Sequence, residues 1–242
     1  MTFPFIDAET MPILSRPDYP PKSVGYATKI GRKCDYLAFG HPEGNNCTKP
    51  QAITQVRSAL RVGKPVFHGA AFDIEVMAAD GITFKGDHHG TLKQAYLSDP
   101  NSRDLGLKPQ AEEHCGEAPE ERDALKAWIC EHIPEAKRKP STWGEWIHKA
   151  PGQLVGSYAK GDVRRSEMLL NAFGQNIFDR GMEAAYRREL ALTPIKLSME
   201  QGGIRVRLAE LKKELKYYEH MHEATAAMIR KRLRCSDLHG AS

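Results

Sequence analysis

The strand-like segments of this chain all lie within its first 67 residues. Short apolar or β-branched runs predict strands over 3–6, 24–30, 34–39 and 65–67. Gly31-Arg32-Lys33 separates the second run from the third and is typical of a hairpin turn. A helical stretch over 50–61 precedes the fourth run, so the expected order is β, β, β, α, β. Strands that come first and helices that follow favour a mixed α/β or α+β fold.

Helical patterns dominate the remainder. They predict helices over 73–79, 91–97, 107–114, 119–132 and 152–179. From residue 183 onward the composition shifts to Ala, Glu, Lys, Leu and Arg, and Gly202-Gly203 divides this part into two more helices. We therefore expect a domain over 1–182 and a helical extension over 183–242.

The second helix of the extension carries an apolar stripe. Its members recur at alternating spacings of three and four: Leu208, Leu211, Leu215, Tyr218, His222, Thr225 and Ile229. This spacing is typical of a helix packed along a partner helix.

Composition argues against several classes of protein. No apolar run approaches the ~20 residues that cross a bilayer, and Asp7 and Glu9 interrupt any signal peptide. We therefore expect a soluble, cytoplasmic protein with no membrane partner. The five cysteines are scattered without Cys-x-x-Cys spacing, which argues against disulfides and structural zinc. The net charge is +4, and the basic excess lies in 180–242, which carry 13 basic against 8 acidic residues, whereas 1–179 carry 22 against 23. Such a basic segment fits a nucleic-acid partner or a solvated helix.

Three short segments carry the candidate chemistry. Asp7 and Glu9 are two residues apart at the end of the first strand, so both carboxylates point to one side and suit a hard divalent cation. Asp73 follows an apolar strand and a small-residue turn, where the helix macrodipole alone would favour an acid. Tyr158 and Asp162 are four residues apart and share one helix face. Each pattern alone is also what an ordinary strand or helix shows.

In this order, the segments Asp7-x-Glu9, His68-Gly69-x-x-Phe72-Asp73 and Tyr158-x-x-x-Asp162 resemble the three motifs of the DEDDy 3′–5′ exonucleases. Further similarity to the exonuclease domain of bacteriophage family A DNA polymerases covers 64–77, 97–100, 105–109, 119–129 and 142–162. Residues 183–242 resemble the helical segment that leads into the polymerase domain. The resemblance implies a proofreading exonuclease domain truncated before the polymerase, with a ribonuclease H-like (DnaQ-like) mixed sheet flanked by helices and a two-helix extension.

The resemblance also implies roles for the site residues. Asp7 would bridge two Mg²⁺ or Mn²⁺ ions, Glu9 and Asp162 would complete the tighter site, and Asp73 would hold the second ion. Tyr158 would orient the attacking water. The substrate would be a single-stranded 3′ end of DNA, in the cytoplasm, or in the host cell cytoplasm if the protein is phage-encoded. A polymerase subunit or domain would be its partner.

Substrate contacts are expected from a second set of residues, which comprises Thr10, His68, Gly69 and Phe72. Phe72 would serve as a stacking platform for a base, because stacking replaces base pairing at a frayed end. The basic side chains of Lys160, Arg164 and Arg165 would meet phosphates or remain solvated.

The chain departs from the family pattern at three positions. Gly69 stands where the family usually has an Asn that holds the terminal nucleotide, Gly90 where an Asp is common, and Arg207 where an acidic cap is frequent. Two other functions therefore stay open. One is an RNase D-like 3′ RNA exonuclease, and the other is a non-catalytic DNA-binding or docking module of a split polymerase.

Overall fold

The fold is built on one mixed five-stranded sheet with the order β3-β2-β1-β4-β5. The computed structural model describes residues 2–84 and 86–233. The strands are β1 (Pro4–Thr10), β2 (Ser23–Ile30), β3 (Lys33–Ala38), β4 (Val66–Phe67) and β5 (His89–Gly90). The first three form an antiparallel meander, and β4 and β5 then run parallel to β1. The hairpin expected at residue 31 is confirmed, with Gly31 at a φ of 56°.

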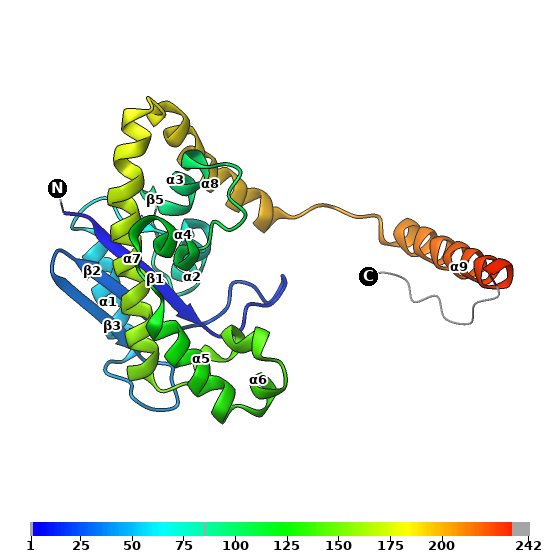
Figure 1. The fold of residues 1–242 in the computed structure, drawn as a ribbon, viewed down its shortest axis with the longest axis horizontal. Helices are drawn as coiled ribbons and strands as arrows, with labels where there is room; N and C mark the ends of the chain where they lie inside the picture. Colours follow the sequence, from blue (N-terminus) through cyan, green and yellow to red (C-terminus); the bar gives the residue numbers. More distant parts are fainter. Residues whose placement is uncertain (1, 85, 234–242) are drawn as a thin grey trace. The chain divides into compact units, whose positions relative to one another are not determined.

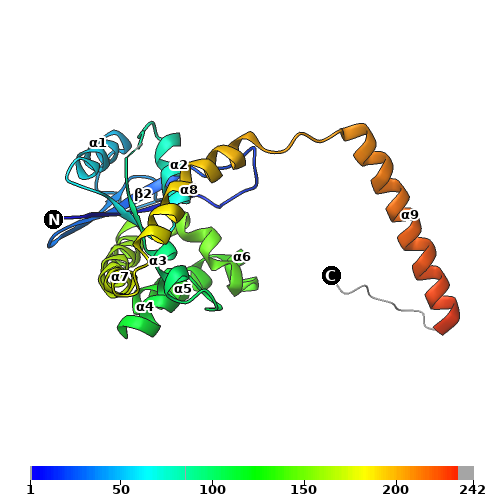
Figure 2. The same cartoon turned by 90° about the horizontal axis from the view of Figure 1, so that it is seen from above.

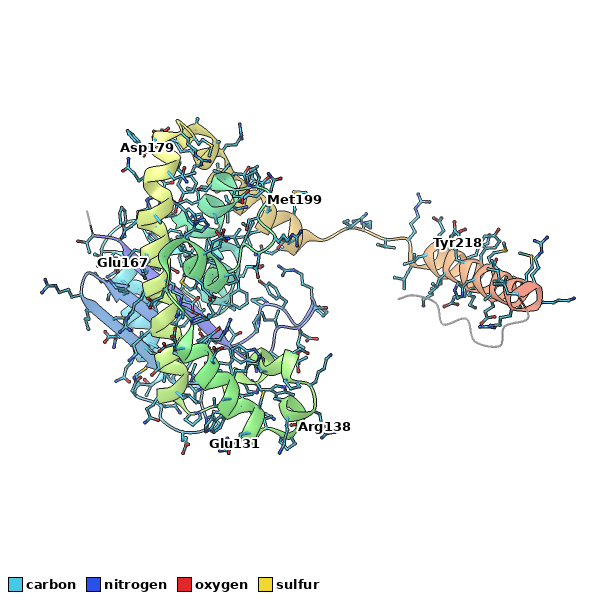
Figure 3. All side chains as sticks on the ribbon, viewed as in Figure 1. Glu131, Arg138, Glu167, Asp179, Met199 and Tyr218 are labelled. Carbon is cyan, nitrogen blue, oxygen red and sulfur yellow. The ribbon has the colours of Figure 1, made fainter. Side chains whose placement is uncertain are left out.

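Two sets of helices cover the two faces of this sheet (Figures 1 and 2). One face packs against α1 (Lys49–Leu60) and α2 (Ala70–Ala79), and the other packs against the long helix α7 (Gly152–Asp179). The remaining elements of this region are α3 (Thr91–Ser98), α4 (Leu107–Cys115), α5 (Glu120–His132), α6 (Pro134–Arg138) and the 3₁₀ helix η1 (Pro140–Lys149). Glu167, labelled in Figure 3, links α7 to the sheet: its Oε1 accepts a 2.7 Å hydrogen bond from the Nζ of Lys29 in β2.

Side-chain alternation along β1 decides where the acids point. Ile6 and Ala8 belong to the core shared with α1 and α2, whereas Phe5 belongs to the core beneath α7. Because successive side chains of a strand face opposite sides, Asp7 and Glu9 share the face of Phe5. The fold thus presents both carboxylates to α7.

Three elements differ from expectation. β1 continues through Asp7 and Glu9 to Thr10, because pairing with β2 extends that far and the acids are accommodated on the α7 side. The sequence does not predict the two-residue strand β5, because this strand forms through pairing with β4 rather than through local strand propensity. α6 and η1 fill the stretch between α5 and α7, where no helix was predicted.

The extension contains the two expected helices, α8 (Glu183–Gly202) and α9 (Leu208–Leu233). The chain divides into compact units between Leu197 and Ser198, so the first turns of α8 belong to the larger unit. Tyr186 anchors them: its hydroxyl accepts a 3.1 Å hydrogen bond from the Gly90 amide, and its ring stacks on His89.

Within the smaller unit, no described residue of α9 is buried. Leu208, Leu211, Leu215 and Tyr218 are all more than half exposed. Of the cysteines, Cys34, Cys47, Cys115 and Cys130 carry free thiols, and Cys235 lies outside the described residues. None of the helices in the described ranges has the length and apolarity needed to span a membrane.

Candidate active site

Three carboxylates from β1 and α7 converge at one point. Ligand oxygens of Asp7, Glu9 and Asp162 all lie within 4.8 Å of one another. Asp7 and Glu9 reach this point from β1, and Asp162 faces them from the middle of α7. Glu9 and Asp162 are buried, and Asp7 is partly buried. An all-oxygen donor set of this kind fits a hard divalent cation such as Mg²⁺ or Mn²⁺.

The electrostatics of the cluster also favour a cation. Burial, and then the nearby Asp162 carboxylate, raise the pKa of Asp7 to about 7. Burial and the Asp7 carboxylate raise the pKa of Glu9 well above its usual range. The pKa of Asp162 is raised by burial, although Lys108 acts in the opposite direction. Buried like charges repel one another, and a bound cation relieves both that repulsion and the cost of desolvation.

Asp73 is not one of these three clustered carboxylates, but it contacts β1 between Asp7 and Glu9. It lies in the first turn of α2, and its Oδ1 accepts a 3.0 Å hydrogen bond from the amide of Ala8, the residue between Asp7 and Glu9. Its side chain is only 3% exposed, so interaction with the helix macrodipole at a solvated surface does not explain its presence. Burial, followed by the charge of Asp7, raises its pKa well above the usual range.

Tyr158 and Asp162 lie on one face of α7, and Lys108 joins them. The Lys108 Nζ donates hydrogen bonds to both carboxylate oxygens of Asp162 at 2.6 Å and to the Tyr158 hydroxyl at 3.1 Å. It also lies 4.2 Å from the centre of the Tyr158 ring. Sequence reasoning did not single out Lys108, because only the packing of α4 against α7 brings it here.

Arg165 holds the other side of Asp162. It is 1% exposed, forms an ion pair with Glu121 of α5, donates to the Ala118 carbonyl at 3.0 Å and lies 3.7 Å from Asp162. The expectation that Arg165 meets phosphate or solvent is therefore wrong. The close approach of Glu121 explains Gly161, because a Cβ there would collide with the Glu121 carboxylate.

A cavity of about 400 Å³ opens beside Glu9. Thr10 and Phe72 line it together with the loop that follows β1 and with Gly144 and Ile147 of η1. The Phe72 ring is half-buried and lies 6.5 Å from the ring of Tyr19. The structure thus brings two of the four expected substrate residues into one hollow next to the carboxylates.

His68 and Gly69 are placed differently. The Nε2 of His68 donates to the Leu105 carbonyl at 3.0 Å, and its Nδ1 accepts from the Thr91 hydroxyl at 2.8 Å. Burial lowers the pKa of His68 to about 4, so the ring is neutral and both nitrogens are engaged within the protein. Gly69 is the N-cap of α2, and a Cβ built on it would meet no atom within 4 Å. Neither backbone strain nor crowding requires a glycine there.

Comparisons with known proteins bear on this arrangement. No protein-family model matches the chain, and no curated protein is close enough in sequence to be called a relative. Solved structures share its fold. The apo form of a nuclease superposes with a TM-score of 0.57 at 19% identity, and NrnC from Brucella melitensis with 0.57 at 17% identity. Both alignments cover 83% of this chain and 85% of the other.

NrnC has also been solved with bound Mg²⁺ and bound to pGG. The POL domain of Pol1 from M. smegmatis, in complex with DNA primer-template and dNTP, superposes with a TM-score of 0.66 at 15% identity. That alignment covers 99% of this chain but 35% of the other, so the chain spans about a third of the Pol1 domain. The chain thus shares a ribonuclease H-like α/β fold, a mixed five-stranded sheet flanked by helices, with these nuclease and polymerase structures.

Proposed function

We propose that this protein is a metal-dependent 3′–5′ exonuclease that removes nucleotides from single-stranded 3′ ends of DNA. The observation that carries the proposal is the convergence of Asp7, Glu9 and Asp162 within 4.8 Å, with Tyr158 one helical turn before Asp162. The shared fold with a nuclease and with NrnC, which has been solved with Mg²⁺, supports it. A structural ion-pair cluster would not need three carboxylates, two of them buried, at one point.

The residues divide into metal ligands and positioning groups. Asp7 would contact both ions, Glu9 and Asp162 would complete one position, and Asp73 would serve the second. Divalent cations held there would supply Lewis-acid activation of water and would neutralise charge on the leaving 3′ oxygen. The Ala8 amide fixes the Asp73 carboxylate, so this proposed ligand is held in place before substrate arrives.

Tyr158 would orient the attacking water through its hydroxyl. Burial, followed by the charge of Asp162, raises its pKa, so the hydroxyl keeps its proton and acts as a hydrogen-bond group rather than as a base. Its position four residues before Asp162 places it on the face that meets β1.

The cavity beside Glu9 would receive the terminal nucleotide. Phe72 offers an aromatic surface for the base and Thr10 a hydroxyl for the sugar or phosphate. Because Glu9 lines the cavity, a frayed strand entering it would carry its last phosphodiester toward the carboxylates. A duplex would have to unpair first.

A proofreading role requires a polymerase partner. Support comes from the superposition of 99% of the chain on a polymerase structure and from the exposed apolar side chains of α9. Exposed apolar stripes of this kind mark interaction surfaces. RNA is the second candidate substrate, because NrnC bound to pGG shares the fold as well.

The test uses 5′-labelled single-stranded DNA and RNA of one sequence, each incubated with the protein in Mg²⁺, in Mn²⁺ and in EDTA. We expect a ladder that shortens from the 3′ end of DNA and disappears in EDTA. A ladder on RNA alone would move the assignment to an RNase D-like enzyme. No ladder on either strand, with the protein folded, would leave a binding or docking module.

A further inference from the structure

Lys108 presents its ammonium to Asp162 in an unusual way. The Nζ lies 2.6 Å from each of the two carboxylate oxygens, so it sits on the axis between them rather than beside one. The lysine side chain is 13% exposed and that of Asp162 is 7% exposed. A cation chelated by this carboxylate would take the same axial position.

Asp162 cannot bind the Lys108 ammonium and a divalent cation in this position at the same time. Its oxygens are among the ligand atoms that lie within 4.8 Å of those of Asp7 and Glu9. A divalent ion bound there would stand within a few ångströms of the ammonium, in a part of the protein where little water screens the repulsion. One of the two charges has to leave.

The two basic residues near Asp162 differ in how firmly they are held. Arg165 is anchored by Glu121 and by the Ala118 carbonyl, and it is almost entirely buried. Lys108 has a flexible four-carbon stem, and its described hydrogen-bond partners are Asp162 and Tyr158 alone. Lys108 is the cation that can move.

We propose that Lys108 is a further functional residue of this site: its ammonium takes the place of a divalent cation on Asp162, and metal loading displaces it. This inference rests on the proposed metal-dependent function. On displacement the lysine loses both contacts to Asp162, while the Tyr158 ring and hydroxyl stay within reach as its remaining partners. Occupation of the site by metal and release of Lys108 are then one coupled event.

The first experiment measures metal affinity without substrate. Mg²⁺ and Mn²⁺ are titrated by calorimetry into the full-length protein and into Lys108→Met. Lys126→Met serves as the control, because Lys126 is an exposed lysine on α5. Competing ligands are coupled reciprocally, so we expect Lys108→Met to bind metal about tenfold more tightly or better. Lys126→Met should match the wild type. Equal or weaker metal binding by a folded Lys108→Met would overturn the proposal.

The second experiment needs no variant. The wild-type protein is acetylated with an N-hydroxysuccinimide ester at rising Mg²⁺, and each lysine is quantified by mass spectrometry. We expect modification of Lys108 to be slow in EDTA and to rise several-fold along the metal-binding curve, while Lys126 stays constant. Unchanged protection of Lys108 at saturating Mg²⁺ would contradict displacement.

The two claims fail in different ways. If neither the wild type nor Lys108→Met binds Mg²⁺ or Mn²⁺, the proposed metal-dependent function falls, and the displacement falls with it. If the wild type binds metal while Lys108 stays protected, the displacement alone is wrong.

Discussion

The Asp73 carboxylate accepts a 3.0 Å hydrogen bond from the main-chain amide of Ala8, 65 residues earlier in the chain. Ala8 separates Asp7 from Glu9, so this bond fixes α2 to the strand that carries the other carboxylates. Under the proposed function, Asp73 therefore has two roles that substitutions can separate. It positions the first turn of α2, and it contributes a negative charge to the proposed metal centre.

Asp73→Asn and Asp73→Ala should differ in stability but not in activity. The Asn oxygen can still accept from the Ala8 amide, whereas Ala leaves that buried donor unpaired, which costs about 1–3 kcal/mol. We expect both variants to lose nuclease activity, and only Asp73→Ala to lose that stability in urea unfolding. Equal stabilities would mean that the hydrogen bond does not position α2.

Tyr158→Phe should slow hydrolysis without abolishing it. The ring and its contact with Lys108 remain, while the hydroxyl that would orient water is lost. Loss of a group that orients a reactant lowers the rate by about 100-fold. Single-turnover kinetics with saturating Mg²⁺ would measure this change, and metal affinity from calorimetry serves as the control. A rate equal to that of the wild type would remove Tyr158 from the mechanism.

The protein stripped of metal should become less stable as the pH rises. The pKa of Asp7 is about 7 in the folded protein and 3.8 as an ordinary side chain. Because the folded value is the higher one, the stability contributed by the protonated acid is complete below about pH 4 and lost by about pH 7. We expect Asp7→Asn to reduce this decline in EDTA melting curves.

Mg²⁺ should counteract this loss of stability at high pH. A cation binds the ionised carboxylates, so the rise in Tm on adding Mg²⁺ should be larger at about pH 8 than at about pH 5. Melting curves at both pH values, with and without Mg²⁺, provide the measurement. An equal rise at both values would contradict the raised pKa of Asp7 as a feature of the metal site.

Gly69→Asn should be tolerated and should strengthen substrate binding. A side chain at this N-cap meets open space, and Asn is among the preferred N-cap residues, so we expect the free energy of unfolding to change by no more than a few tenths of a kcal/mol. Under the proposed function, we expect the added amide to lower the KM for a single-stranded 3′ end about threefold to tenfold, equivalent to one hydrogen bond. An unchanged KM would show that this position does not reach the terminal nucleotide.

Local pattern explains why much of the fold was predictable. The hairpin at Gly31 and helix α7 follow from turn chemistry and from helical periodicity, and α7 has the predicted bounds of 152–179. The spacing of Asp7 and Glu9 places both on one face of a strand, and the structure brings them to Asp162. These features depend on residues that are close in sequence.

The remaining features depend on packing between distant elements. Lys108 and Asp162 are 54 residues apart, and no local pattern in α4 distinguishes this lysine from a solvated one. The sequence of α7 predicts a surface position for Arg165, but in the structure it is buried and paired with Glu121 of α5. Strand β5 forms because it pairs with β4 and because the Tyr186 hydroxyl accepts a hydrogen bond from the Gly90 amide.

The most direct test of the central claim compares Asp7→Ala with the wild type and with Asp87→Ala, which removes an acid that is 93% exposed. All three are incubated with 5′-labelled single-stranded DNA and Mg²⁺, and circular dichroism confirms that each is folded. We predict a ladder from the 3′ end with the wild type and Asp87→Ala, and an intact substrate with Asp7→Ala. A ladder of equal rate from folded Asp7→Ala would contradict a metal centre at Asp7, Glu9 and Asp162.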